Sequence, residues 1–300
     1  MPVWWAVAPG PRCPGSVGSA VARLPGVAAI DDLIQLVPPP HVPVDSTGDW
    51  QPVEAELGLE LPADYKALIE RYGVGRFVDF ISPLTPFGDN PYVDLIRIAR
   101  LLAEDDEPFR QQHPGISPYP FYPAPGGLVP WAQTDNGDRL CWLTIGPPEE
   151  WITVSWNPRD WTYDTHQVSA VEFLYGWITG AISSTVFGDG DDAVPWFEPY
   201  RERQRITFRL SDSPLPYAER LRILREALGP TADRGSYENG RGRRQDHFAA
   251  TEREWRLTYE TAYGHGVRVW FPRGDDERVR TVLPEVIARM GCEIVGTTPQ

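Results

Sequence analysis

The feature that most constrains the fold is a run of apolar side chains at helical spacing between residues 61 and 72. They occupy positions i, i+4, i+7, i+8 and i+11, one face of an amphipathic helix, and are Leu61, Tyr65, Leu68, Ile69 and Tyr72. Pro62 stands at the first turn, where its missing N–H costs nothing. Gly73 and Gly75 follow the last position, as is typical of a helix end. The stripe therefore predicts a core helix.

Short alternating segments downstream indicate an antiparallel sheet for this helix to pack on. Residues 128–134 and 139–145 are separated by Asp135-Asn136-Gly137-Asp138, and Asn-Gly is the strongest short hairpin signal. The other predicted elements are strands at 77–81, 151–156 and 163–167, helices near 30–34, 92–103 and 168–182, and a Pro-rich loop at 114–130. This pattern predicts an α+β fold with a central, mostly antiparallel sheet flanked by helices.

The last hundred residues show a different order of predicted strands and helices. The predicted order is a strand at 206–210, a helix at 217–228, strands at 255–259 and 267–271, a helix at 279–290 and a strand at 293–295. The order β-α-β-β-α-β is typical of a small ferredoxin-like α+β domain. Residues 229–252 are polar and are predicted to be a loop. Its Gly240–Arg244 run is interpreted as a solvated loop rather than a phosphate-binding loop, because no aromatic RNA-binding motif accompanies it.

The balance of acidic and basic side chains changes near residue 200, where the pattern of predicted elements also changes. Residues 1–200 hold 10 basic and 27 acidic side chains, a net charge of −17, whereas residues 201–300 hold 18 and 15, a net of +3. We therefore predict two domains, 28–200 and 201–300, after a disordered or mis-assigned start at 1–27. The acidic part should repel nucleic acid and attract a basic protein. An equally open alternative is that its acidity only keeps the protein soluble.

Cysteine usage and the lack of long apolar runs indicate the cellular compartment in which the protein is expected. Cys13, Cys141 and Cys292 are far apart and form no CxxC, which fits a reducing cytoplasm better than a disulfide framework. No convincing secretion signal is present, and the charge-free run 173–188 is shorter than the roughly 20 residues that span a bilayer. The prediction is a cytoplasmic protein without a membrane segment.

Residues that could carry chemistry are few. The five histidines are isolated, and no Walker loop, dinucleotide fingerprint or nucleophile elbow occurs, so no metal, no cofactor and no catalytic residue are predicted. Cys141 and His166 could form a nucleophile and base, but the apolar neighbours of Cys141 favour an inert buried thiol. Asp189-Gly190-Asp191-Asp192 lacks the full ligand set of a calcium loop. The chain is therefore predicted not to be an enzyme.

One stretch resembles a known family. "LGLELPADYKALIERYGVGRF" (residues 57–77) resembles the opening signature of the SUKH superfamily, which includes the Smi/Knr-type regulators and many bacterial immunity proteins. "LVPWAQTDNGDRLCWLT" (128–144) resembles its hairpin, in which two Trp-bearing strands flank an Asp/Gly turn, and "WITVSW" and "VSAVEFLYGWITG" follow in the family's order. The resemblance covers about residues 30–200. It implies a SUKH-like α+β domain and a non-catalytic role in binding a toxin, often a nuclease.

We therefore predict an immunity protein that neutralises a basic, cognate polymorphic toxin, such as a nuclease. The alternative is an intracellular regulatory or scaffold protein of the Smi/Knr type that acts through protein–protein binding. Exposed acidic turns with neighbouring aromatics are the candidate contacts, because turns project from a sheet and aromatics beside charge are typical of interface anchors. The candidate partner-binding residues are Asp135, Asp138, Asp189, Asp191, Asp192, Trp196 and Glu198. A protein toxin or another basic protein is the expected partner, with no nucleic acid and no membrane.

Overall fold

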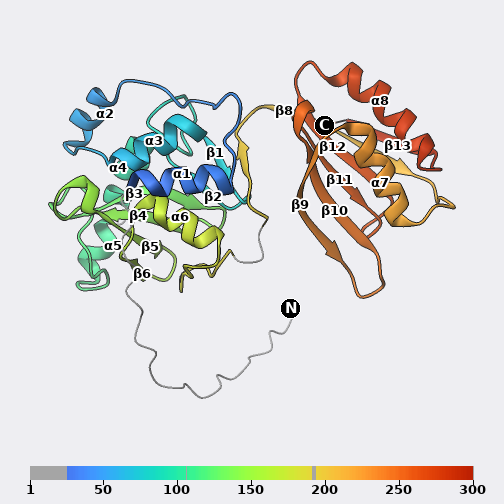
Figure 1. Cartoon of the computed structure of the whole chain (residues 1–300). Coiled ribbons are helices and arrows are strands. Elements are labelled where there is room, and N and C mark those ends of the chain that lie inside the picture. Colours follow the sequence, from blue (N-terminus) through green and yellow to red (C-terminus); the bar gives the residue numbers. More distant parts are fainter. Residues whose placement is uncertain (1–25, 106, 191–193, 300) are drawn as a thin grey trace.

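Residues 26–105, 107–190 and 194–299 are described by the structure, a computed structural model (Figure 1). Helices and two antiparallel sheets make an α+β fold, as predicted. The start at 1–27 lies outside the described residues except for its last two, which already belong to a helix. No helix of the described ranges has the length and apolar character that crossing a membrane needs.

The first sheet has seven strands in the spatial order β6-β5-β4-β3-β2-β1-β7. Its strands are β1 (Gly75–Phe77), β2 (Ile81–Pro83), β3 (Leu128–Thr134), β4 (Arg139–Leu143), β5 (Ile152–Asn157), β6 (Thr162–His166) and β7 (Phe197–Pro199). The Asn-Gly hairpin is confirmed, because β3 and β4 pair with Gln133 opposite Arg139. β7 comes from far along the chain and closes the sheet beside β1, with Glu198 opposite Arg76.

Three helices cover one face of this sheet (Figure 1). They are α1 (Gly26–Leu36), α3 (Ala63–Tyr72) and α6 (Ala170–Ile178). The predicted stripe is the centre of this core, since all five of its side chains are buried. Tyr72 donates to the carbonyl of Val37 at 2.6 Å, which joins α3 to the end of α1. Gly73 ends α3 at φ +64, and a Cβ there would lie 2.0 Å from the carbonyl oxygen of Val44, so only glycine fits.

The opposite face of the first sheet packs on a separate apolar cluster. Phe121, from the Pro-rich segment, lies against Trp156 of β5 with ring centroids 4.8 Å apart. Two further helices, α2 (Trp50–Leu57) and α5 (Glu107–Gln112), and a short 3-10 turn at Pro148–Glu150 were not predicted. The helix predicted near 92–103 is α4, with the bounds Leu95–Asp105. α2 escaped prediction because its eight residues bury only Val53 and Leu57, too few for a visible stripe.

The second sheet has six strands in the order β13-β8-β12-β11-β10-β9. Its elements are β8 (Arg203–Leu210), α7 (Tyr217–Leu228), β9 (Thr231–Glu238), β10 (Arg244–Ala250), a 3-10 turn (Thr251–Arg253), β11 (Trp255–Glu260), β12 (Gly266–Pro272), α8 (Asp276–Arg289) and β13 (Ile294–Pro299). The order β13-β8-β12-β11 is the 4-1-3-2 arrangement that the predicted β-α-β-β-α-β sequence gives when consecutive helices pack on one face.

The predicted loop at 229–252 is wrong. It is a hairpin, β9–β10, that extends the edge of the second sheet beyond β11. Most β9 side chains are half-buried or exposed, so the strand shows neither an apolar run nor a clean alternation. The Gly240–Arg244 run forms the hairpin tip, where Asn239 accepts from the backbone N–H groups of Arg241 and Arg243 at 3.0 and 3.1 Å.

Candidate partner-binding site

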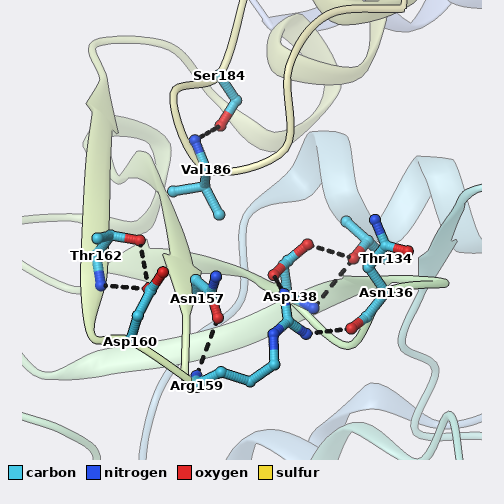
Figure 2. Close-up of polar contacts among 9 residues, drawn as sticks. All are labelled: Thr134, Asn136, Asp138, Asn157, Arg159, Asp160, Thr162, Ser184 and Val186. Carbon is cyan, nitrogen blue, oxygen red and sulfur yellow. Dashed lines mark hydrogen bonds and ion pairs between the residues drawn. The ribbon is translucent and has the colours of Figure 1, made fainter. Parts of the chain in front are cut away.

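The β3–β4 turn is held by side-chain contacts of Asp138 (Figure 2). The side chain of Asp138 is only 1% exposed, so the expectation that both aspartates of this turn face solvent is wrong for Asp138. Its carboxylate accepts from the Thr134 hydroxyl at 2.9 Å, and its own N–H donates back to that hydroxyl at 3.0 Å. Asp138 therefore folds the turn rather than presenting charge to a partner.

A second turn is tied to the first by one arginine. Arg159, in the β5–β6 turn, donates to the carboxylate of Asp138 at 2.5 Å and to the backbone carbonyl of Asn136 (Figure 2). Asn157 accepts from the N–H of Arg159 at 2.9 Å, which fixes the backbone from which that side chain leaves. Asp160, next in the turn, is exposed, and the hydroxyl of Thr162 lowers its pKa by donating to it at 2.7 Å. The two turns thus form one cross-linked end of the sheet, on which Asp160 is exposed.

Asp135 is the exposed acidic residue of the β3–β4 turn, as predicted. Its side chain is 61% exposed, and Arg76 of β1 lies 2.8 Å away. Arg76 is also 3.4 Å from Asp79, so one guanidinium is shared by two carboxylates. A pair this open to water neutralises little of the negative field around the turn.

Asp189 lies on a third segment at the same end of the sheet. This segment is closed by Ser184 and Gly188, whose backbone groups bond to each other at 2.9 and 2.7 Å, and the N–H of Thr185 donates to Asp164 of β6 at 2.8 Å. Figure 2 shows Ser184 and Val186 beside the two turns. Asp189 itself is exposed. Asp191 and Asp192 lie outside the described residues.

Trp196 was expected to face a partner, and that expectation is wrong. Its side chain is 5% exposed and lies between two guanidinium groups of the second sheet. The ring centroid is 4.5 Å from Arg234 Cζ and 5.3 Å from Arg256 Cζ. Glu198 is also largely covered, with its side chain 13% exposed and paired with Arg203 at 2.8 Å. An aromatic beside charge marks a contact surface, but here the surface it contacts belongs to the same chain.

The pair weighed for nucleophilic chemistry is separated by the sheet. Cys141 lies opposite Val154, while His166 lies opposite the next residue, Thr153, so the two side chains point to opposite faces. Burial raises the pKa of the Cys141 thiol to about 12, which keeps it protonated and inert. No group of three or more His, Cys, Asp or Glu side chains able to hold a metal ion occurs within 26–105, 107–190 and 194–299.

The exposed carboxylates of Asp135, Asp160 and Asp189 form what we call the acidic rim, on three turns at one end of the first sheet. The predictions included two of these and missed Asp160 and the arginine that braces the turns. A signal for the missed turn was present in Asn157-Pro158-Arg159-Asp160, a composition typical of turns. Charge at fixed positions can attract and orient a basic surface.

Comparison with known protein families gives a match over part of the chain. Residues 47–174 match the family model described as SUKH_6: SMI1-KNR4 cell-wall. That range contains α3, the β3–β4 hairpin, β5, β6 and the start of α6. Searches of curated proteins and of solved structures found no match.

Proposed function

We propose that this chain, which carries a SUKH superfamily domain over residues 47–174, is a non-enzymatic immunity protein that binds and neutralises a basic protein toxin. The observation that carries the proposal is the acidic rim, three exposed carboxylates on turns at one end of the first sheet, two of which Arg159 and Asp138 lock together. A rigid charged surface loses little conformational entropy when a partner docks, so its electrostatic attraction is retained as affinity.

Charge supports a basic partner. The field of residues 1–200, with 10 basic against 27 acidic side chains, favours encounter with a cationic surface and disfavours polyanions. Asp191 and Asp192 follow Asp189 in sequence, and we include all three in the proposed contact. Trp196, Glu198 and Asp138 are assigned to folding, because their contacts within the chain leave them little exposed surface.

The free, buried thiols Cys141 and Cys292 fit a reducing compartment, and we propose that the protein acts in the cytoplasm. A toxin that reaches the cytoplasm, such as a nuclease, would be bound there by this protein.

Affinity capture from the native cell tests the proposal with three proteins side by side. These are the wild type, the rim variant Asp135→Lys/Asp160→Lys/Asp189→Lys, and the control Asp212→Lys/Glu252→Lys/Glu277→Lys. The control makes the same change of net charge at exposed positions of the second sheet and its connections. We expect the wild type and the control to capture a basic protein that the rim variant loses.

The captured protein is then expressed alone and together with each form. Relief of its toxicity by the wild type and not by the rim variant is the expected result. Capture of the same proteins by all three forms would refute the rim as the binding surface. A basic partner that is not toxic would favour the regulatory or scaffold role instead.

A further inference from the structure

The two faces of the second sheet are different surfaces. Helices α7 and α8 cover one face, where Ile206, Leu257 and Val269 belong to a buried core (Figure 1). Alternate residues of the same strands point to the other face, which no helix of the described residues covers and which Trp196 and Asp79 contact only at Arg256 among the residues considered below. We call this the open face and define it by Arg205, Arg209, His247, Arg256, Arg268 and Trp270.

Strand register places these side chains in cross-strand rows. Trp270 of β12 lies opposite Arg256 of β11 on one side and opposite Arg205 of β8 on the other. The guanidinium carbons of these two arginines lie 6.0 and 5.9 Å from the Trp270 ring centroid. Residues opposite each other on one face are close enough to act together, so this row is one cation–aromatic–cation strip.

The positive charge of the open face is only partly balanced. Arg268 pairs with Glu260, and Arg256 pairs with Asp79 of the first sheet's β1–β2 turn at 2.9 Å. Within the part of the chain that the structure describes, neither Arg205 nor Arg209 makes an ion pair with a carboxylate. The Nε–H of Arg205 is buried without a hydrogen-bond partner. A guanidinium in this position lacks the carboxylate that its planar fork matches.

We propose that the open face docks an acidic segment of a protein partner, with carboxylates bound to Arg205 and Arg209. The surface is separate from the acidic rim and opposite in charge, so it goes beyond the proposed toxin contact. A partner with acidic side chains fits because it supplies the missing counter-charges. Trp270 fits the same partner as a flat apolar support between the two arginine side chains.

The ring geometry favours an acidic protein over single-stranded nucleic acid. Bases bind such surfaces by stacking on free aromatic faces. Trp270 is already flanked by guanidinium groups from both neighbouring strands. The next aromatic along the sheet, Tyr237, is stacked on Tyr263 with ring centroids 6.2 Å apart and planes 6° from parallel.

A fluorescent oligoglutamate peptide and the full chain give a direct test by anisotropy at low salt. The whole chain has a net charge of −14, so general electrostatics oppose this peptide and binding requires a local cationic site. The test variant is Arg205→Glu/Arg209→Glu. The matched control is Arg222→Glu/Arg280→Glu on α7 and α8, where both arginines already pair with carboxylates of their own helix.

We expect the wild type and the control to bind the peptide with an affinity that falls as salt is added. The Arg205→Glu/Arg209→Glu variant should bind about tenfold more weakly or not at all, the loss expected when close charge pairs at an interface are removed. Its circular dichroism spectrum should match the wild type, and its capture of the basic partner should be unchanged. That last result separates this surface from the rim.

Three outcomes would overturn the proposal. One is equal peptide binding by the test and control variants. Another is tighter binding of oligothymidine than of oligoglutamate, lost in the same variant, which would assign the face to nucleic acid. The third is a salt-sensitive dimer that the variant abolishes, which sedimentation would detect and which would make a second copy of the chain the occupant.

Discussion

The guanidinium of Arg159 lies 2.5 Å from the carboxylate of Asp138, and the acidic partner of this pair is almost completely buried while the basic one is half exposed. The contact spans two turns that are separate in sequence. Because Thr134 occupies the other carboxylate oxygen, Asp138 is the common anchor of both turns.

Replacing Asp138 by Ala should destabilise the protein by about 1–3 kcal/mol, because Thr134 and Arg159 would both lose a hydrogen-bond acceptor. Urea unfolding measures the change. Asp135→Ala, in the same turn but exposed, should change the free energy of unfolding by no more than about 0.5 kcal/mol. Equal effects of the two substitutions would show that the buried contact is not what holds the turns.

Leu68→Ala tests whether the apolar stripe of α3 belongs to the core. Leu68 is fully buried in α3, and truncation of such a leucine typically costs about 2–5 kcal/mol. The melting temperature should fall by at least roughly 4 °C. Glu70→Ala, exposed on the same helix, is the control and should melt within about a degree of the wild type. An unchanged melt for Leu68→Ala would contradict the assignment of this face to the core.

We propose that the chain divides into two folded units near residue 200, and Trp196→Ala tests how they are joined. The substitution removes the ring held between Arg234 and Arg256, contacts worth about 0.5–2 kcal/mol each. Trypsin should then cleave faster after Arg201, which pairs with Glu254 of the second sheet's unit at 2.9 Å. The exposed Tyr92→Ala variant should be cleaved at the wild-type rate. Faster cleavage inside residues 130–180 instead would place the boundary elsewhere.

Stability should fall as the pH drops below about 6.5, because half-buried histidines resist protonation. Burial lowers the pKa of His166 below its usual 6.5, with Asp164 opposing the shift. The unfolded chain therefore takes up a proton first, so stability is complete above pH 6.5 and is lost as the pH falls through the folded pKa. His247 and His265 are shifted in the same direction, mainly by burial.

Urea unfolding at about pH 7.5 and about pH 5.5 measures this loss above the range where most carboxylates titrate. His166→Gln should reduce the loss, whereas replacement of the exposed His113 by Gln should leave it at the wild-type size. A loss that is identical in all three proteins would exclude His166 as its source.

Local patterns predicted the elements that are amphipathic by themselves. The α3 stripe, the Asn-Gly hairpin and the paired helices of the last hundred residues could all be read from the spacing of apolar residues. The β9–β10 hairpin could not, because it adds to an existing sheet and its outer strand presents polar side chains on both faces. Its position depends on pairing with β11. Pairing of that kind produces no periodic spacing of apolar residues in the sequence.

The candidate site was predicted in part for a related reason. Asp135 and Asp189 are exposed as turn geometry suggests, but the burial of Asp138 depends on an arginine 21 positions away in sequence. Trp196 likewise is covered by side chains from β9 and β11, which lie later in the chain. Sequence composition marks such residues as contact-forming, and only the tertiary fold decides which surface they contact.

The edge strand β9 of the second sheet contains a bulge. Between the pairs His247–Gly235 and Phe248–Asp233, Arg234 has no partner across β10, and this extra residue is the one that turns over Trp196. A straight, open outer strand would offer its backbone groups to another molecule and invite aggregation. Here the kink, the charged neighbours and the covered arginine interrupt that row of groups. Along this edge the bulge should therefore disfavour pairing with a strand of another chain.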